Sequence, residues 1–340
     1  MIRVIRILIV IGCLVAAGNA AASTPDEDAC AALPTSADVI AACSRLIDKT
    51  TAPKERAWVL TLRARARTEQ GDLAGAVDDC NSALALRPKY DSALAIRAGA
   101  YERLKNYDLA LRDSTQAISL KPDDAEYYNT RGLTYRELGE PARALADLDQ
   151  AIKLMPDYPT AYNNRGITYK DLGEPDRAIE DFKQAIKLSP NYVLAYYNLG
   201  ETENDVNGDY DQAIADLSTA LKLNPGLGAA YLNRGIAYAR TKNTAAALAD
   251  FNEVIANQPD LPEAYRDRGS LYLTNGDNAR ALADFDKAVG LDPQDAAARY
   301  ERGVARMRTG DKSGGQADIA AAKKLDPKLA GTMAKLLGQK

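Results

Sequence analysis

The sequence contains no histidine, the residue most often used as a general base and as a zinc ligand. Catalytic Ser-His-Asp and Cys-His arrangements are excluded for the same reason. No cluster of base and nucleophile stands out elsewhere in the chain. We therefore expect a protein that is not an enzyme, has no catalytic or metal-binding residues and uses no cofactor.

Large aromatic side chains are also scarce, with three Phe and one Trp in 340 residues, although there are 18 Tyr. Alanine is abundant, and small apolar residues favour helices that pack closely. A composition of 46% hydrophobic and 26% charged residues is typical of a folded soluble protein. Wholesale disorder is therefore not expected.

The chain has no long block of one charge. Its 43 basic and 47 acidic residues are interleaved, and the formal net charge is -4. A protein that binds nucleic acid or an anionic membrane surface usually shows a basic patch or stripe. Nucleic acid is therefore not an expected partner.

The longest apolar run lies at the N-terminus. "MIRVIR" is followed by "ILIVIGCLVAAG" and then by the small residues "NAAAS", in the order of a secretory signal peptide. The run is shorter than the roughly 20 residues that a spanning helix needs. We predict a cleaved signal over residues 1–22, no stable membrane span, and a periplasmic or secreted protein. In the alternative, "VIGC" resembles a lipobox and Cys13 carries a lipid anchor.

Cysteine is rare, and removal of the signal leaves Cys30, Cys43 and Cys80. Cys30 and Cys43 bound the short stretch "CAALPTSADVIAAC", and oxidised cysteines persist in exported proteins. The spacing predicts a Cys30–Cys43 disulfide and leaves Cys80 as a buried free thiol.

From residue 57 onward a pattern recurs about every thirty-four residues. Its eight copies cover 57–90, 91–124, 125–158, 159–192, 193–227, 228–261, 262–295 and 296–329. Position 8 of each copy is Ala or Gly, position 20 is Ala in all but the last copy, and position 32 is always Pro. Two amphipathic stretches, joined by a turn such as "LGEP", predict a helix hairpin in each copy. Such hairpins bury their apolar faces by stacking, which predicts an all-α, right-handed superhelical solenoid.

This spaced Gly, Tyr, Ala and Pro pattern resembles the tetratricopeptide repeat, here of the kind found in exported bacterial proteins. The resemblance implies eight repeats over residues 57–329. "VIAACSRLID" matches the second helix of a repeat, so residues 23–56 are expected to form an N-terminal half-repeat cap. Residues 330–340 are expected to form a short C-terminal capping segment.

Two copies depart from the pattern. The fifth has one extra residue, and Glu203 stands where a Tyr is expected. The eighth has Arg299 and Arg306 at both aromatic positions, so we expect the last repeat to be the most loosely packed. The fifth copy also contains "DVNGDYD", which faintly resembles a calcium loop but lacks the Gly and Glu that such a loop requires. A lengthened polar turn is the preferred interpretation.

A charged pair recurs as regularly as the Pro. Position 7 is Arg in seven copies and Leu199 in the fifth, and position 23 is Asp in all eight. An Arg ladder of this kind could recognise an acidic ligand. Equal numbers of the two charges favour bidentate Arg–Asp pairs between neighbouring helices instead, which makes these residues structural.

In the family that the chain resembles, positions 2, 5, 6, 9 and 12 of the first helix line a concave surface. Asparagine recurs there, and Asn offers a donor and an acceptor to an extended peptide backbone. The predicted peptide-binding residues are Asn129, Asn163, Asn164, Tyr197, Asn198 and Asn233. Alternatively, these Asn residues only make local hydrogen bonds. The expected function is a non-catalytic scaffold of the bacterial envelope that binds a protein or peptide; the alternative is a structural envelope component that self-associates.

Overall fold

The computed structural model describes Cys30 and residues 35–328, and these residues form helices joined by short turns. No strand occurs among them, so the prediction of an all-α fold is confirmed. The expected signal peptide, residues 1–22, and the expected C-terminal segment, residues 330–340, lie outside the described residues.

The helices are α3 (Ser36–Lys49), α4 (Pro53–Gln70), α5 (Leu73–Leu86), α6 (Asp91–Arg103), α7 (Tyr107–Leu120), α8 (Ala125–Glu137), α9 (Pro141–Leu154), α10 (Pro159–Asp171), α11 (Pro175–Leu188), α12 (Val193–Thr202), the π-helix η1 (Glu203–Asn207), α13 (Tyr210–Leu223), α14 (Gly228–Arg240), α15 (Thr244–Asn257), α16 (Pro262–Thr274), α17 (Asn278–Leu291), α18 (Ala296–Thr309) and α19 (Lys312–Leu325).

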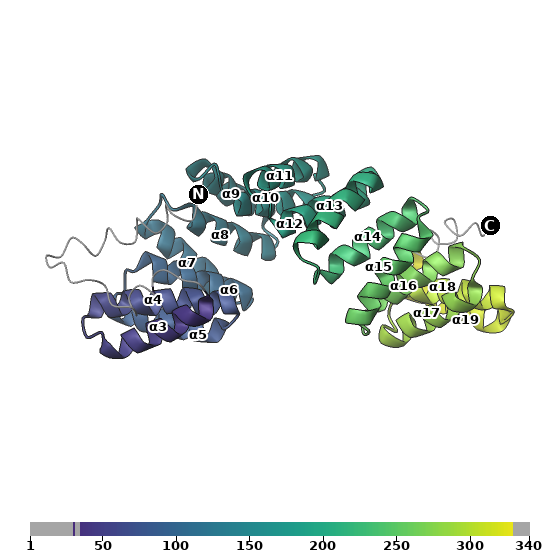
Figure 1. The fold of residues 1–340 in the computed structure, drawn as a ribbon, viewed down its shortest axis with the longest axis horizontal. Coiled ribbons are helices and arrows are strands. Elements are labelled where there is room, and N and C mark those ends of the chain that lie inside the picture. The colour runs from purple at the N-terminus through teal and green to yellow at the C-terminus, as the bar shows by residue number, and fades with distance from the viewer. Residues whose placement is uncertain (1–29, 31–34, 329–340) are drawn as a thin grey trace. The chain divides into compact units, whose positions relative to one another are not determined.

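The chain divides into two compact units, Met1–Leu172 and Gly173–Lys340. In the first unit, α3 is followed by the hairpins α4–α5, α6–α7 and α8–α9 and by α10 (Figure 1). In the second, α11 is followed by the hairpins α12–α13, α14–α15, α16–α17 and α18–α19 (Figure 1). Each unit is thus a stack of helix hairpins, as the repeat predicts.

The two helices of a hairpin approach closely where position 8 is Gly. A Cβ atom added at Gly235 would lie 2.7 Å from Cε1 of Phe251, and one at Gly269 would lie 2.9 Å from Cε1 of Phe285. Both phenylalanines are almost fully buried. The missing side chain at position 8 is therefore what lets the large residue of the second helix fill the space between the helices.

The last hairpin contradicts the expectation of loose packing. A Cβ atom at Gly303 would lie 2.8 Å from the carbonyl oxygen of Gly315, so glycine on both helices brings α18 and α19 close together. Arg306 Nη1 lies 2.9 Å from Asp318 Oδ2, which adds a second guanidinium to this Asp. The arginine at this aromatic position thus strengthens the hairpin instead of loosening it.

The other arginine of this repeat also replaces a tyrosine contact. Arg299 Nε donates to the carbonyl oxygen of Pro293 at 2.8 Å. At the same position of the preceding repeat, the Tyr265 hydroxyl donates to the carbonyl oxygen of Pro259 at 3.1 Å. Either side chain therefore satisfies the carbonyl that follows the end of the previous helix.

Helix α3 packs against α4 and so covers the first hairpin of the stack. Cys30 and Cys43 form the predicted disulfide, and both lie in a core cluster with Leu46 and Leu60. Cys80 is a buried free thiol, as predicted, and burial raises its pKa to about 12. It therefore behaves as a core residue at neutral pH.

In seven of the eight repeats the turn between the two helices has a left-handed residue at position 15, and in the fifth, which has an extra residue, it is Gly208 at position 16. Glycine occupies position 15 as Gly71, Gly139, Gly173, Gly276 and Gly310, whose φ angles are all positive. Lys105 and Lys242 occupy it in two repeats, with φ of 60° and 62°. Because a side chain is disfavoured in this region, both lysines are held there by the flanking helices.

We predict that Lys105→Gly raises the free energy of unfolding by about 1 kcal/mol, because glycine removes the left-handed strain. Thermal and urea unfolding of the purified variant measure the effect. Gly139→Ala is the matched control and should lower stability by a similar amount. A Lys105→Gly variant that is less stable than wild type would contradict the argument.

Candidate functional site

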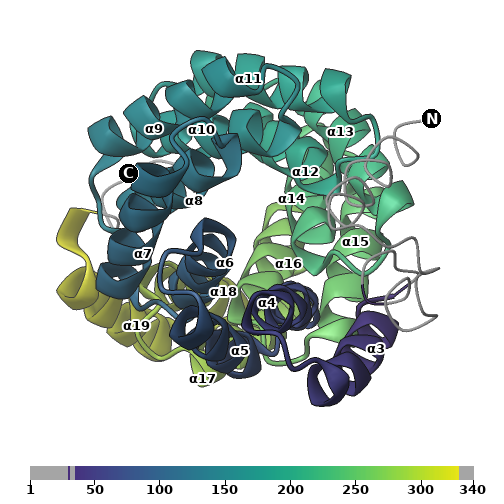
Figure 2. The same ribbon diagram turned by 90° about the vertical axis from the view of Figure 1, so that its left-hand side faces the viewer.

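The first helices of the hairpins form one face of each unit. In the first unit α4 contacts α6, α6 contacts α8, and α8 contacts α10; in the second, α12, α14, α16 and α18 are in contact in the same order. Figure 2 shows these helices on the inner side of each unit and the second helices, such as α9 and α13, on the outer side. The inner side is the concave face on which a binding site is expected.

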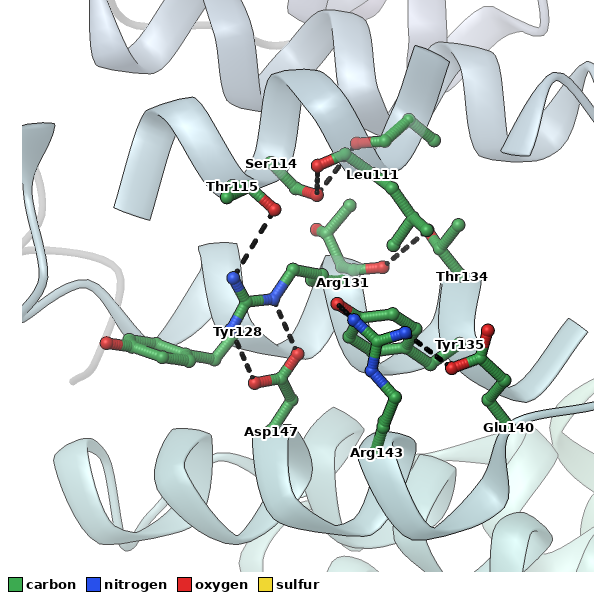
Figure 3. A network of polar contacts seen from close by, with 12 residues as sticks. Leu111, Ser114, Thr115, Tyr128, Arg131, Thr134, Tyr135, Glu140, Arg143 and Asp147 are labelled. Carbon is green, nitrogen blue, oxygen red and sulfur yellow. Dashed lines mark hydrogen bonds and ion pairs between the residues drawn. The ribbon is translucent and has the colours of Figure 1, made fainter. Parts of the chain in front are cut away.

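The recurring Arg–Asp pair lies between the two helices of a hairpin. In the third repeat, Arg131 Nε donates to Asp147 Oδ2 at 2.7 Å and Nη2 donates to Oδ1 at 2.8 Å (Figure 3). The same bidentate pair joins Arg63 to Asp79, Arg97 to Asp113, Arg234 to Asp250, Arg268 to Asp284 and Arg302 to Asp318. These six pairs bear out the structural interpretation.

Each of these arginines also contacts the helix that precedes its own hairpin. Arg131 Nη1 donates to Thr115 Oγ1 on α7 at 3.4 Å, as Figure 3 shows, and Arg234 Nη1 donates to Ser218 Oγ on α13 at 3.0 Å. One guanidinium therefore ties three helices together. Hydrogen bonding to Asp147 raises the pKa of Arg131 despite its partial burial.

The predicted asparagines of the first unit are largely buried. Asn129, Asn163 and Asn164 are between 2% and 7% exposed. Asn164 Nδ2 donates to Asn129 Oδ1 at 2.9 Å, which links α10 to α8. The local hydrogen bonding that was the alternative interpretation is therefore present here, and peptide binding by these residues stays a prediction.

The predicted residues of the second unit are half-buried and belong to a different network. Asn233 Nδ2 donates to the Tyr197 hydroxyl at 3.2 Å, and that hydroxyl donates to Glu201 Oε1 at 2.9 Å. Asn204 Nδ2 donates to the Asn233 carbonyl oxygen at 2.8 Å. Burial and the neighbouring Glu201 raise the pKa of Tyr197. Asn198 is half-buried on the same helix, α12.

The first unit has a cavity of about 230 Å³ on its concave face. Helices α4, α6 and α8 contribute its lining. The lining residues are Arg65, Thr68, Glu69, Ser92, Ala95, Ile96, Gly99, Arg103, Glu126, Tyr127 and Thr130. Most of them occupy the positions that the repeat pattern assigns to the concave face, and the cavity extends from the first repeat to α8, the helix that carries Asn129.

The middle helix, α6, presents two small residues and one aliphatic residue to this cavity. Ala95, Ile96 and Gly99 stand at positions 5, 6 and 9 of α6, and a Cβ atom at Gly99 would meet nothing within 4 Å. The repeat pattern does not single out these residues as a site, because none of them has a hydrogen-bonding side chain. The available signal was the small size of Ala95 and Gly99, which lie about one helical turn apart on the concave face.

On α16 of the second unit, the equivalent positions carry charged or polar side chains. At positions 5, 6 and 9 of α16 stand Arg266, Asp267 and Ser270, which interact with Asp295 and Glu301. Arg266 Nη1 donates to Asp295 Oδ2 at 3.0 Å, and Ser270 Oγ donates to Glu301 Oε2 at 2.8 Å. The same face is therefore filled by a polar network here, and burial raises the pKa of Glu301 to about 7.

These features define a class of protein: a solenoid of stacked helix hairpins with a concave face suited to binding. Four family models, each described as tetratricopeptide repeat, match residues 98–162, 159–192, 182–215, and 206–262 with 266–330. The chain belongs to the tetratricopeptide repeat family. The search of curated proteins gave no match.

Several solved structures share the fold. A chain of the APC/C hetero-tetramer Cut9–Hcn1 has a TM-score of 0.67 at 18% identity, over 80% of this chain. This chain spans about half, 52%, of that protein. A tetratricopeptide repeat protein from Parabacteroides merdae has a TM-score of 0.52 at 23% identity, with coverage of 73% and 98%. PilW, a widely conserved type IV pilus biogenesis factor, has a TM-score of 0.56 at 21% identity, with coverage of 60% and 94%.

Among Cys30 and residues 35–328, no helix has the length and hydropathy of a membrane span. In the same part of the chain, no three His, Cys, Asp or Glu residues are grouped so that they could hold a metal ion. The stretch "DVNGDYD" instead contains the end of η1 and a left-handed Gly208.

We predict that Arg131→Ala lowers the free energy of unfolding by about 3 kcal/mol, because Asp147 is left buried without its cation. Chemical denaturation measures the change. Lys121→Ala, which removes an exposed pair with Asp124, is the control and should cost less than about 1 kcal/mol. Equal losses in the two variants would show that the Arg–Asp pair is not the structural tie described here.

We predict that Asn164→Ala lowers stability by about 1–2 kcal/mol, because the buried Asn129 oxygen loses its donor. In a double-mutant cycle, Asn129→Ala with Asn164→Ala should cost much less than the sum of the two single changes. Additive losses would mean that the hydrogen bond between them contributes nothing to stability.

Proposed function

We propose that this protein is a non-catalytic scaffold that binds a protein or peptide through the concave face of its repeats. The observation that carries the proposal is the cavity over α4, α6 and α8. It lies on consecutive first helices, it is open to a ligand at Gly99, and the hydrogen bonds of the Arg–Asp pairs fix the helices around it. A preformed surface lowers the entropy cost of binding.

The chemistry of the cavity suits an extended peptide. Ile96 and Ala95 provide apolar area, and the absent side chain of Gly99 lets a ligand backbone approach the helix. The hydroxyls of Ser92 and Thr130 add hydrogen-bonding groups at the wall. Charged residues of both signs line the same cavity, so the surface favours a polar peptide over a purely apolar one.

We further propose that the protein acts in the bacterial envelope, as a periplasmic or secreted protein. The N-terminal sequence has the order of a secretory signal. The Cys30–Cys43 disulfide supports the same location, because disulfides persist in oxidising compartments and are rare in the cytosol. Mature protein purified from the envelope should then lack about twenty residues at its N-terminus.

We predict that Gly99→Phe weakens partner binding at least tenfold, because the ring fills the cavity. The variant should unfold at the same temperature as wild type or higher, since glycine is a poor residue inside a helix. Affinity capture from envelope extract identifies the partner, and calorimetric titration then compares the two proteins. Loss of about 1.4 kcal/mol of binding free energy corresponds to tenfold.

The matched control is Gly290→Phe on α17, a second helix. A Cβ atom there also meets nothing within 4 Å, so the same substitution adds the same ring to the outer side. This variant should bind like wild type. Equal affinity of wild type and both variants for the partner would show that the cavity is not the binding site. Capture of no partner, together with concentration-dependent self-association in sedimentation velocity, would favour the self-assembling structural component instead.

A further inference from the structure

The fifth repeat is the one copy that lacks the arginine for its buried aspartate. Leu199, 2% exposed, takes the place of the arginine, and Asp216 is 8% exposed on α13. Gln212 Nε2 donates to Asp216 Oδ2 at 2.9 Å, which supplies a hydrogen bond but no charge. A buried carboxylate without a cation is strongly destabilised unless a proton or another donor reaches it.

Glu203 stands at position 11 of this repeat. Other repeats show which residue a side chain at position 11 contacts. Arg67 and Arg306 occupy position 11 in the first and eighth repeats, and each lies within 3.0 Å of the aspartate of its own hairpin. A side chain at position 11 therefore meets the aspartate at position 23. In the fifth repeat this brings a second carboxyl group, and not a cation, to Asp216.

The Glu203 carboxyl group is deeply buried. Glu203 is only 3% exposed, and its Oε2 atom has no hydrogen-bond partner among the described residues. Burial, together with the charge and hydrogen bonding of Asp216, raises the pKa of Glu203 to about 8. Two carboxyl groups in one site cannot both ionise without a large cost.

Glu203 also begins the π-helix. η1 covers Glu203–Asn207 and takes up the extra residue of the fifth repeat. η1 contacts α12, α13 and α14, and its Asn204 donates to the Asn233 carbonyl oxygen on α14 at 2.8 Å. The π-turn therefore connects the buried carboxyl pair to the concave face of the second unit.

We propose that Glu203 and Asp216 share one proton that holds η1 against α13, and that loss of this proton opens η1 and releases Asn204 from α14. The fifth repeat is then a pH-sensitive element of the solenoid. Glu203 supplies the O–H donor and Asp216 the acceptor, so the proton replaces the guanidinium of the other repeats.

In the part of the chain that the structure describes, no charged group near Glu203 and Asp216 neutralises the pair in place of that proton. Lys183 on α11 lowers the pKa of Glu203, but its effect is smaller than those of burial and of Asp216, and Asp209 at the start of α13 acts in the opposite direction. On α14, Arg234 is engaged in its bidentate pair with Asp250.

The sign of the pH dependence follows from the raised pKa. Between the ordinary pKa of a glutamate and that of Glu203, the closed turn keeps the proton and the open turn loses it. Opening should therefore become easier as pH rises, by up to tenfold per pH unit between about pH 5 and 8, and should level off above that range.

Amide hydrogen exchange of the full chain tests the proposal. Protection factors for residues 199–208, corrected for the intrinsic pH dependence of exchange, should fall with pH over this range in wild type. Glu203→Gln can still donate to Asp216 but cannot ionise, so its protection should not change with pH. The control Glu301→Gln removes a different buried carboxyl group of the second unit and should keep the wild-type profile at residues 199–208.

Protection that is independent of pH in wild type would overturn the proposal, whether or not the variants fold. A Glu203→Gln protein that keeps the full pH dependence would also overturn it. Leu199→Arg gives a second variant, because a guanidinium at position 7 stabilises both carboxylates, and it should flatten the pH profile as well.

Discussion

The buried aspartate at position 23 is the constraint on which the stack of hairpins depends. A carboxylate between two helices needs a cation, and the arginine at position 7 supplies one with two parallel hydrogen bonds. The same guanidinium reaches back to the preceding hairpin, as Arg131 does to Thr115. Charge neutralisation and the spacing of neighbouring hairpins are therefore produced by one side chain. Once these hydrogen bonds hold the first helices side by side, the residues at the concave positions of those helices are free to vary.

That freedom explains why the concave faces of the two units differ. In the first unit Ala95 and Gly99 leave a cavity beside Ile96, whereas on α16 of the second unit Arg266 and Asp267 occupy the equivalent positions and form ion pairs. Neither set is needed to hold the hairpins together, because the Arg–Asp pairs lie between the first and second helices. A binding surface can thus be built or closed, repeat by repeat, without a change in the scaffold.

Most of the scaffold could be predicted from the sequence, since position 8, the terminal prolines and the Arg–Asp pairs each satisfy a requirement that is local to one hairpin. The disulfide followed from the spacing of Cys30 and Cys43. The candidate site was harder, because burial at a concave position depends on the neighbouring first helix: Asn164 is covered and bonded through Asn129 of the preceding repeat. The last repeat was misjudged for a similar reason, since Arg299 makes the contact that a tyrosine hydroxyl makes elsewhere.

The fifth repeat shows what happens when the buried aspartate is present but its arginine is missing. Without an arginine, Asp216 must be stabilised in another way, and Glu203 can do so only while it carries a proton. An arginine is charged at every physiological pH, so the other ties are permanent, whereas a tie made by a proton depends on the solution. The same turn absorbs the extra residue as a π-helix, which weakens the regular hydrogen bonding that would otherwise hold it closed. The pH-dependent Glu203–Asp216 interaction and the irregular π-helical backbone thus occur at the same turn. The hydrogen bond from Asn204 to the Asn233 carbonyl oxygen links this turn to the concave face.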